Sequence, residues 1–131
     1  MSAKEESIRL HDCGFNCAQS VLGALEDYTG LDRKTALAVS GGFGGGVRCG
    51  EICGALSGAV MALGMKAPYV DGEDAQARSR IAKLTMAMTR DFARQFGCVR
   101  CQDLKMNRIP CDELIAWAAE NAETKLKELE S

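Results

Sequence analysis

The chain has 131 residues, and its 16 basic and 18 acidic side chains give a formal net charge of −2. This length predicts one domain that buries a core without cross-links, and the balanced charge, with no basic cluster among aromatic residues, argues against nucleic acid as a partner. The longest uncharged apolar stretch, Ile52 to Met65, is shorter than the roughly 20 residues of a membrane-spanning helix. We therefore expect neither nucleic acid nor a membrane.

Residues that favour helices dominate, and no segment alternates β-branched with polar residues. The sequence predicts an all-α bundle of five or six helices in a single domain covering residues 1–131. The first expected helix covers Ala3 to His11. The second begins after Asn16, a favourable N-cap, and ends at Gly30. Asp32 caps the third, which ends at a glycine run.

The second half of the chain continues this pattern. A fourth helix is expected from Gly50 to Lys66, and a long amphipathic helix from Glu73 to Phe96, with Gly97 as its C-cap. A single turn is expected from Cys101 to Lys105. Pro110 then opens the last helix at a favoured position.

The fourth expected helix carries small residues at every fourth position: Gly50, Gly54, Gly58 and Ala62. One face therefore has almost no side chains. Glycine inside a helix costs about 1 kcal/mol relative to alanine, so something at that face must compensate. The two explanations are tight helix packing, within the chain or at a dimer seam, and a cofactor or metal lying against the glycines.

The glycine run from Gly41 to Gly46 precedes this helix. It fits no dinucleotide fingerprint, and Val47 replaces the lysine that a phosphate-binding loop requires. We interpret it as a flexible or closely packed loop in which glycine permits positive φ.

Six of the seven cysteines fall into three close pairs, and the seventh, Cys111, stands apart. Residues four apart share a helix face, so the pairs Cys13/Cys17 and Cys49/Cys53 would each present two sulfurs to one point if the backbone there is helical. The spacing of Cys98 and Cys101 is used by metal sites and by redox pairs.

Cys17, Cys53 and Cys111 are expected near helix starts, where backbone N–H groups and the helix dipole favour thiolate over thiol. Thiolate is the form that attacks disulfides and binds metals. Arg48 and Arg100 are expected to tune these thiols. The only histidine, His11, is a candidate fifth ligand or proton carrier, although a solvated histidine is the more ordinary interpretation.

An ordered set of motifs carries a family resemblance. The set comprises Cys17-Ala18-Gln19-Ser20, Ser40-Gly41-Gly42-Phe43-Gly44-Gly45-Gly46, Cys53-Gly54-Ala55-Leu56-Ser57-Gly58, Cys101 and Cys111. Over about residues 13 to 120 the chain resembles the C_GCAxxG_C_C family of redox-active proteins. The resemblance implies a small helical protein with four functional thiols. It also extends to the N-terminal part of split-Soret cytochromes, which are dimeric and use iron, although this chain has no haem attachment motif.

The resemblance places the four signature cysteines at Cys17, Cys53, Cys101 and Cys111, which we take as the catalytic or metal-binding set. Gly54 and Gly58 match the signature glycines, and together with Cys49 they form the candidate cofactor-binding set. The roles of Cys13, Cys49 and Cys98 stay open. We expect the four signature thiols to converge, since a shared function requires it.

Two hypotheses follow. The first is a redox protein that transfers electrons or exchanges thiols and disulfides, with an iron–sulfur cluster as the candidate cofactor. If it is an enzyme, it is a thiol-dependent oxidoreductase. The second is a metal-binding module, either a structural zinc site or a sensor or carrier of a soft metal, with the same four ligands. We further expect a cytoplasmic protein, because the charged N-terminus carries no apolar secretion segment. The glycine-lined helix and the resemblance to dimeric proteins predict a homodimer, and a redox protein partner is expected.

Overall fold

The computed structural model describes all residues, 1–131, and contains helices but no strands, which confirms the all-α single-domain expectation. Six of the helices have eight or more residues. In chain order the elements are α1 (Ala3–Asp12), α2 (Cys17–Ala24), α3 (Glu26–Thr29), α4 (Arg33–Ser40), η1 (Gly46–Gly50), α5 (Gly54–Lys66), α6 (Ala75–Phe96), α7 (Cys101–Met106) and α8 (Cys111–Glu130). None of the helices is both long and apolar enough to cross a membrane.

Side-chain caps explain why several helices begin where they do. Asn16 accepts a hydrogen bond from the Gln19 N–H at 2.9 Å, and the Gln19 side chain accepts one from the Asn16 N–H, which forms a complete capping box. Asp32 caps α4 through the N–H of Thr35 in the same way. Gly97 ends α6 with φ of 88°, as expected of a C-cap glycine.

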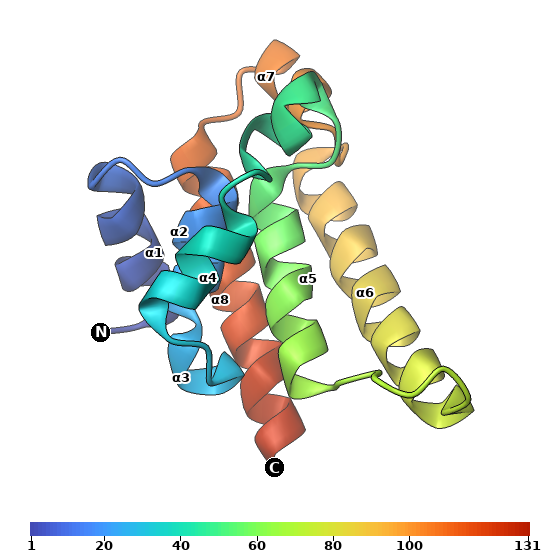
Figure 1. Cartoon of the computed structure of the whole chain (residues 1–131). Helices are drawn as coiled ribbons and strands as arrows, with labels where there is room; N and C mark the ends of the chain where they lie inside the picture. Colours follow the sequence, from blue (N-terminus) through green and yellow to red (C-terminus); the bar gives the residue numbers. More distant parts are fainter.

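Helix α5 lies at the centre of the bundle (Figure 1), and α2 and α8 pack directly against it. Helices α1 and α4 cover the outer side of α2. The core between these helices is built from fully buried aliphatic residues, among them Leu22, Leu63, Ile115 and Leu126. The short α7 and the turn η1 contact each other and close one end of the bundle.

Helix α6 runs along the other side of α5 and diverges from it toward its N-terminal end (Figure 1). The C-terminal half of α6 packs against α8. Phe92 and Phe96 of α6 form an aromatic cluster with Trp117 of α8, with ring centroids 4.9–5.8 Å apart. Two methionines, Met65 of α5 and Met86 of α6, are exposed.

Two helix boundaries differ from the prediction. The helix expected from Asn16 to Gly30 is broken at Leu25, where the backbone leaves the helical region and α3 begins as a separate turn. The helix expected from Gly50 begins at Gly54. The preceding residues form η1 because Gly46 and Gly50 adopt positive φ, which is incompatible with a right-handed helix.

The turn before α5 is left-handed. Four consecutive residues, Gly45 to Arg48, have φ between 57° and 64°. The N–H of Glu51 donates to the carbonyl of Gly46 at 3.0 Å and closes the turn. A Cβ at Gly46 would overlap the backbone of Glu51, so only glycine fits there. The interpretation of the glycine run as a closely packed loop therefore holds at Gly46.

Candidate functional site

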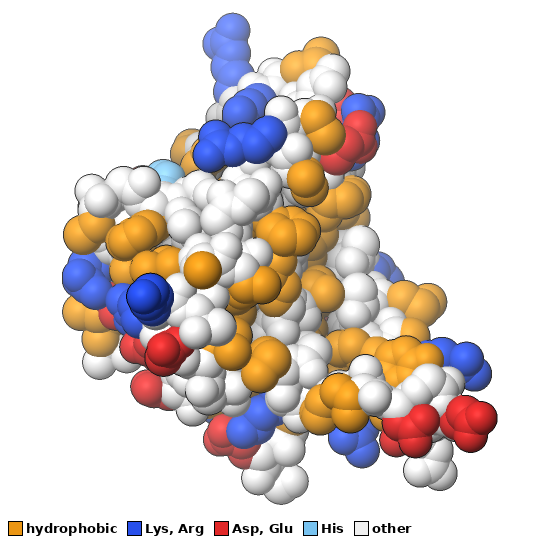
Figure 2. Space-filling view, in the orientation of Figure 1, with side chains coloured by type: hydrophobic (Ala, Val, Ile, Leu, Met, Phe, Trp, Pro, Cys, Tyr) orange, Lys and Arg blue, Asp and Glu red, His pale blue; other side chains and the backbone are white.

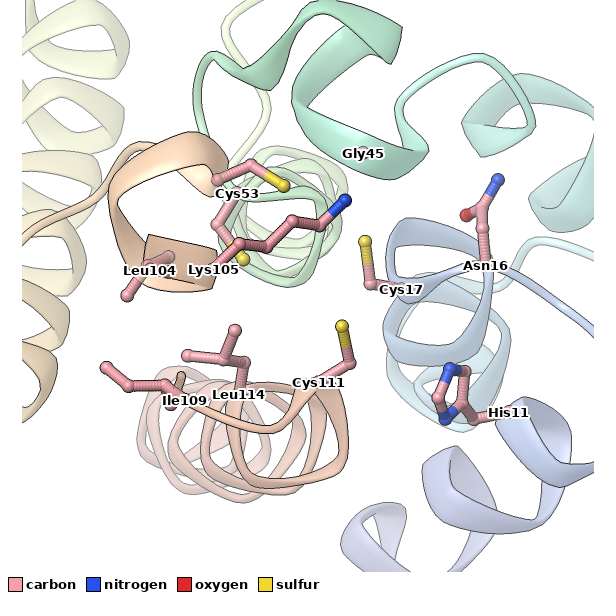
Figure 3. Close-up of a pocket in the computed structure, with 11 residues that line it drawn as sticks. His11, Asn16, Cys17, Gly45, Cys53, Leu104, Lys105, Ile109, Cys111 and Leu114 are labelled. Carbon is pink, nitrogen blue, oxygen red and sulfur yellow. The ribbon is translucent and has the colours of Figure 1, made fainter. Parts of the chain in front are cut away.

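The four signature cysteines line one cavity at the end of the bundle closed by α7. The cavity has a volume of about 180 Å³. Figure 3 shows the sulfurs of Cys17 and Cys111 directed toward its centre. Its lining consists of His11, Asn16, Cys17, Gly45, Cys53, Cys101, Leu104, Lys105, Ile109, Cys111 and Leu114. The four cysteines thus converge on one cavity, as expected.

Each of these cysteines lies at the start of a helix. Cys17, Cys101 and Cys111 are the first residues of α2, α7 and α8. Cys53 is the N-cap residue of α5, one position before the first turn in which the sequence placed it. Four helix starts, with their unpaired N–H groups, therefore face one cavity, an arrangement that favours negative charge on the sulfurs.

A short backbone pairing holds Cys53 and Cys101 next to each other. The N–H of Cys53 donates to the carbonyl of Val99 at 2.9 Å, and the N–H of Cys101 donates to the carbonyl of Glu51 at 2.6 Å. Between these two bonds, Ile52 and Arg100 form an isolated antiparallel bridge. Main-chain hydrogen bonds therefore position two cysteines that are distant in the sequence.

The glycine face of α5 positions Cys17. Gly54 and Gly58 are buried against α2. A Cβ at Gly54 would overlap the sulfur of Cys17, and a Cβ at Gly58 would lie 2.7 Å from the carbonyl oxygen of Ala18. These are the contacts of tight helix packing within the chain, and neither glycine lines the cavity. Gly54 thus contributes to the site by leaving room for the Cys17 sulfur.

The cysteine sulfurs do not form a compact group of ligand atoms. Among histidine, cysteine and acidic side chains, the one group of three whose ligand atoms all lie within 4.8 Å of each other is His11, Asp12 and Asp112. No three of the cysteine sulfurs meet this limit. The chain also contains no disulfide, and all seven cysteines are free.

Burial keeps two of the thiols protonated. Cys53 is 3% exposed, and desolvation raises its pKa to about 12, with further raising by the neighbouring Cys17 and Cys101. The N–H groups of Leu56 and Ala55 at the start of α5 lower this pKa but do not offset the burial. The expectation that a helix start makes Cys53 a thiolate is therefore wrong for the metal-free chain, because desolvation is the larger effect.

The pKa of Cys111 is raised as well. Desolvation raises the pKa of its thiol, and Cys17, Cys101 and Asp112 raise it further. Lys105 lowers it. Figure 3 shows the Lys105 side chain reaching across the cavity from α7. Lys105 was missed in the sequence analysis, although its position four residues after Cys101 on an expected turn places both on one helix face.

The two arginines expected to flank the thiols lie outside the cavity lining. Arg100 is paired with Glu51 at 3.3 Å and with Asp103 at 3.8 Å, so its charge is directed at carboxylates. Arg48 projects from the left-handed turn into a groove that Cys101 also lines.

His11 lies at the rim of the cavity and is half-buried. Its Nδ1 lies 2.6 Å from Oδ1 of Asp112, the residue after Cys111. This contact joins the end of α1 to the start of α8. His11 is therefore held beside the site rather than solvated freely, in contrast to the more ordinary interpretation.

The three remaining cysteines do not line the cavity. Cys13 is the exposed C-cap of α1, and Cys49 is exposed in η1. Cys98 follows α6 and packs against the core. The pairs Cys13/Cys17 and Cys49/Cys53 do not share a helix face as expected, because a turn separates the two members of each pair.

The family comparison agrees with the motifs. The family described as "Putative redox-active protein (C_GCAxxG_C_C)" matches residues 15–125. The chain therefore belongs to this family, whose description indicates redox activity. No curated protein and no solved structure matches the chain. The similarity to split-Soret cytochromes is not confirmed by these comparisons.

Proposed function

We propose that this member of the C_GCAxxG_C_C family is an electron-transfer protein in which Cys17, Cys53, Cys101 and Cys111 hold an iron–sulfur cluster. The observation that carries the proposal is the arrangement of these four cysteines, and no others, around one cavity of about 180 Å³. Iron–sulfur clusters are held by four cysteine thiolates. A bound cluster would supply the one-electron chemistry that thiols alone do not provide.

The spacing of the sulfurs favours a centre with several metal ions over a single ion. Four sulfurs about 2.3 Å from one zinc ion lie about 3.8 Å from each other in a tetrahedron. No three of the cysteine sulfurs lie within 4.8 Å of each other here. A single zinc ion would require the sulfurs to move closer together, whereas a cluster with several iron ions accepts a wider spacing.

The protonation state of the buried thiols favours a metal centre over thiol–disulfide exchange. The attacking species in exchange is the thiolate, and burial raises the pKa of Cys53 to about 12 and that of Cys111 above its usual value. Both thiols are therefore weak nucleophiles at neutral pH in the metal-free chain. A metal ion deprotonates a coordinating thiol outright. The four helix starts would then stabilise the resulting thiolates.

The other lining residues control the surroundings of the sulfurs. Leu104 and Leu114 are buried, and Ile109 is half-buried, so one wall of the cavity is apolar. Such a wall limits water around the site, and burial of this kind changes the reduction potential of a cluster. Lys105 adds a positive charge near Cys111 that offsets part of the negative charge of four thiolates.

The experiment is anaerobic purification, followed by an absorption spectrum and measurement of iron, zinc and acid-labile sulfide per chain. The proposal predicts iron and sulfide in similar amounts and visible absorption that bleaches on reduction. Stoichiometric zinc without sulfide would instead support the alternative of a metal-binding module. A metal-free protein that forms a disulfide between two signature cysteines would support thiol exchange.

The proposal also includes the expected homodimer and the cytoplasmic location. Helix α5 carries no charge before Lys66, and a helix that is apolar on all faces is ordinarily buried on all faces. Here Val60 and Met61 line an open groove that α6 covers only in part. We propose that a second copy covers this face, and that the cytoplasmic protein exchanges electrons with a protein partner. A monomer mass from light scattering at micromolar concentration would contradict the dimer.

A further inference from the structure

A second groove lies directly beside the cavity that holds the four cysteines. Its volume is about 400 Å³, and its lining consists of Gly45, Arg48, Gly50, Cys101, Gln102 and Lys105. Three of these residues, Gly45, Cys101 and Lys105, also line the cysteine cavity. A molecule in this groove would therefore touch the wall of the redox site. We call it the Arg48 groove.

The charges in the Arg48 groove are positive and unpaired. Arg48 and Lys105 line it, and no carboxylate does. Both side chains are exposed, and neither forms an ion pair or a side-chain hydrogen bond. The neighbouring Arg100, in contrast, pairs with Glu51. Figure 2 shows basic side chains (blue) projecting from this end of the molecule. Two free cations over one concave surface attract an anion.

The backbone that holds Arg48 is strained. Val47 and Arg48 have φ of 57° and 61°, a left-handed conformation that residues other than glycine rarely adopt. Such strain persists where the surrounding structure imposes it, and it gathers at ligand sites. Here the left-handed turn carries Arg48 to the wall of the groove.

We propose that the Arg48 groove binds a small oxyanion, the carboxylate or phosphate group of a small molecule bound beside the redox site, with Arg48 and Lys105 as its cationic ligands. Its volume lies within the roughly 300–1,000 Å³ of small-molecule sites. Glu51 and Asp103, which pair with Arg100 and follow the lining residues Gly50 and Gln102 in the chain, would repel a broad acidic protein surface. An influence of this oxyanion on the cluster rests on the proposed function, whereas oxyanion binding itself does not require a cluster.

The first test compares two alkylating reagents on the reduced, metal-free chain. Iodoacetate is anionic and iodoacetamide is neutral, so the ratio of their rates at one cysteine reports the local charge and cancels changes in thiolate fraction. Peptide mapping gives this ratio at Cys101, with the exposed Cys13 as the internal reference. A unit charge about 6 Å away in water changes the ratio about threefold, so Arg48→Asn with Lys105→Gln should lower it about tenfold at low salt.

The matched control is Arg108→Asn. Arg108 also has positive φ, 59°, and is exposed, but it lines neither the cavity nor the groove. Asparagine tolerates this backbone conformation better than most residues, so both arginine variants should fold. The control should leave the ratio at Cys101 unchanged. An equal fall in the control, or no fall in the double variant, would overturn the proposal.

The second test measures binding to the full chain as isolated, by calorimetry with inorganic phosphate and with citrate. Binding of either probe that is lost in the double variant and kept in Arg108→Asn supports the site, and the stronger probe identifies phosphate or carboxylate as the preferred group. Binding of neither probe, or binding only of an acidic protein, would overturn it. A cluster that forms normally beside a groove that binds no oxyanion leaves the proposed function intact and refutes only this inference.

Discussion

Alanine at two glycines of α5 should separate the stability of the protein from the assembly of its site. Gly58 packs on the backbone of α2, and a Cβ there would lie 2.7 Å from the carbonyl oxygen of Ala18. Gly54 packs on the Cys17 side chain itself. A third glycine of the same helix, Gly64, has no atom within 4 Å of the position of a Cβ and serves as the control.

The magnitudes follow from these contacts. Alanine at an open helix position stabilises by up to about 1 kcal/mol, which is the expectation for Gly64→Ala. Gly58→Ala gains the same helix propensity, but α2 must move away because a backbone oxygen cannot rotate aside. Overpacking of this kind costs about 1–3 kcal/mol. Gly58→Ala should therefore be about 1–3 kcal/mol less stable than Gly64→Ala.

Gly54→Ala should act mainly on the site. The short Cys17 side chain avoids the new methyl group by changing its rotamer, which removes its sulfur from the cavity. The carbonyl oxygen of Phe43, 2.8 Å from the new Cβ, must also shift. We expect a loss of iron and sulfide binding that is large compared with the loss of stability.

The assay pairs urea unfolding of the three metal-free variants with measurement of their bound iron and sulfide after anaerobic reconstitution. The expected order of stability is Gly64→Ala above Gly58→Ala, with Gly54→Ala impaired most in cluster binding. If Gly58→Ala and Gly64→Ala were equally stable, the close approach of α2 and α5 would be refuted. Normal cluster binding by Gly54→Ala would refute the placement of Cys17.

Three further predictions concern single side chains. The metal-free chain should lose stability above pH 9. The pKa of Cys53 is about 12 in the folded chain and 9.0 in the ordinary thiol. The buried thiol therefore makes its full contribution to the free energy of unfolding below pH 9, and this contribution is about 1.4 kcal/mol smaller at pH 10. Urea unfolding should show a smaller alkaline loss in Cys53→Ala, and an identical loss would contradict the buried, protonated thiol. Lys105→Gln should raise the pKa of Cys111, measured as a shift of its iodoacetamide reaction to higher pH, whereas an unchanged profile would remove Lys105 from the site. Leu104→Ala, at a 1% exposed position in the cavity wall, should lower the free energy of unfolding by about 2–5 kcal/mol, and a neutral effect in urea would mean that this wall is not packed.

Local rules were sufficient to predict much of the helical framework from the sequence. Asn16 and Asp32 cap helices as expected because an N-cap depends only on a side chain and the N–H group three residues later. Gly97 ends α6 for an equally local reason. The family resemblance selected the four signature cysteines, and the packing of α2, α5, α7 and α8 brings them to one cavity.

The remaining features depend on contacts between distant segments. The left-handed turn places Val47 and Arg48 in a conformation that neither residue favours, so no propensity predicts it. The pairing of Ile52 with Arg100 joins two segments with no strand pattern. The raised pKa of Cys53 arises from burial by the whole bundle, whereas the sequence revealed only the nearby helix start, whose effect is smaller.

The central claim is that four thiols hold one centre, and the most direct test is the iron and acid-labile sulfide bound per chain in single cysteine-to-alanine variants after anaerobic reconstitution. Alanine at Cys17, Cys53, Cys101 or Cys111 should each abolish or strongly reduce both iron and sulfide. Alanine at Cys13, Cys49 or Cys98, which lie outside the cavity lining, should leave both at the wild-type level. Loss of the cluster in a variant of the second group, or its retention in two or more variants of the first group, would contradict the account.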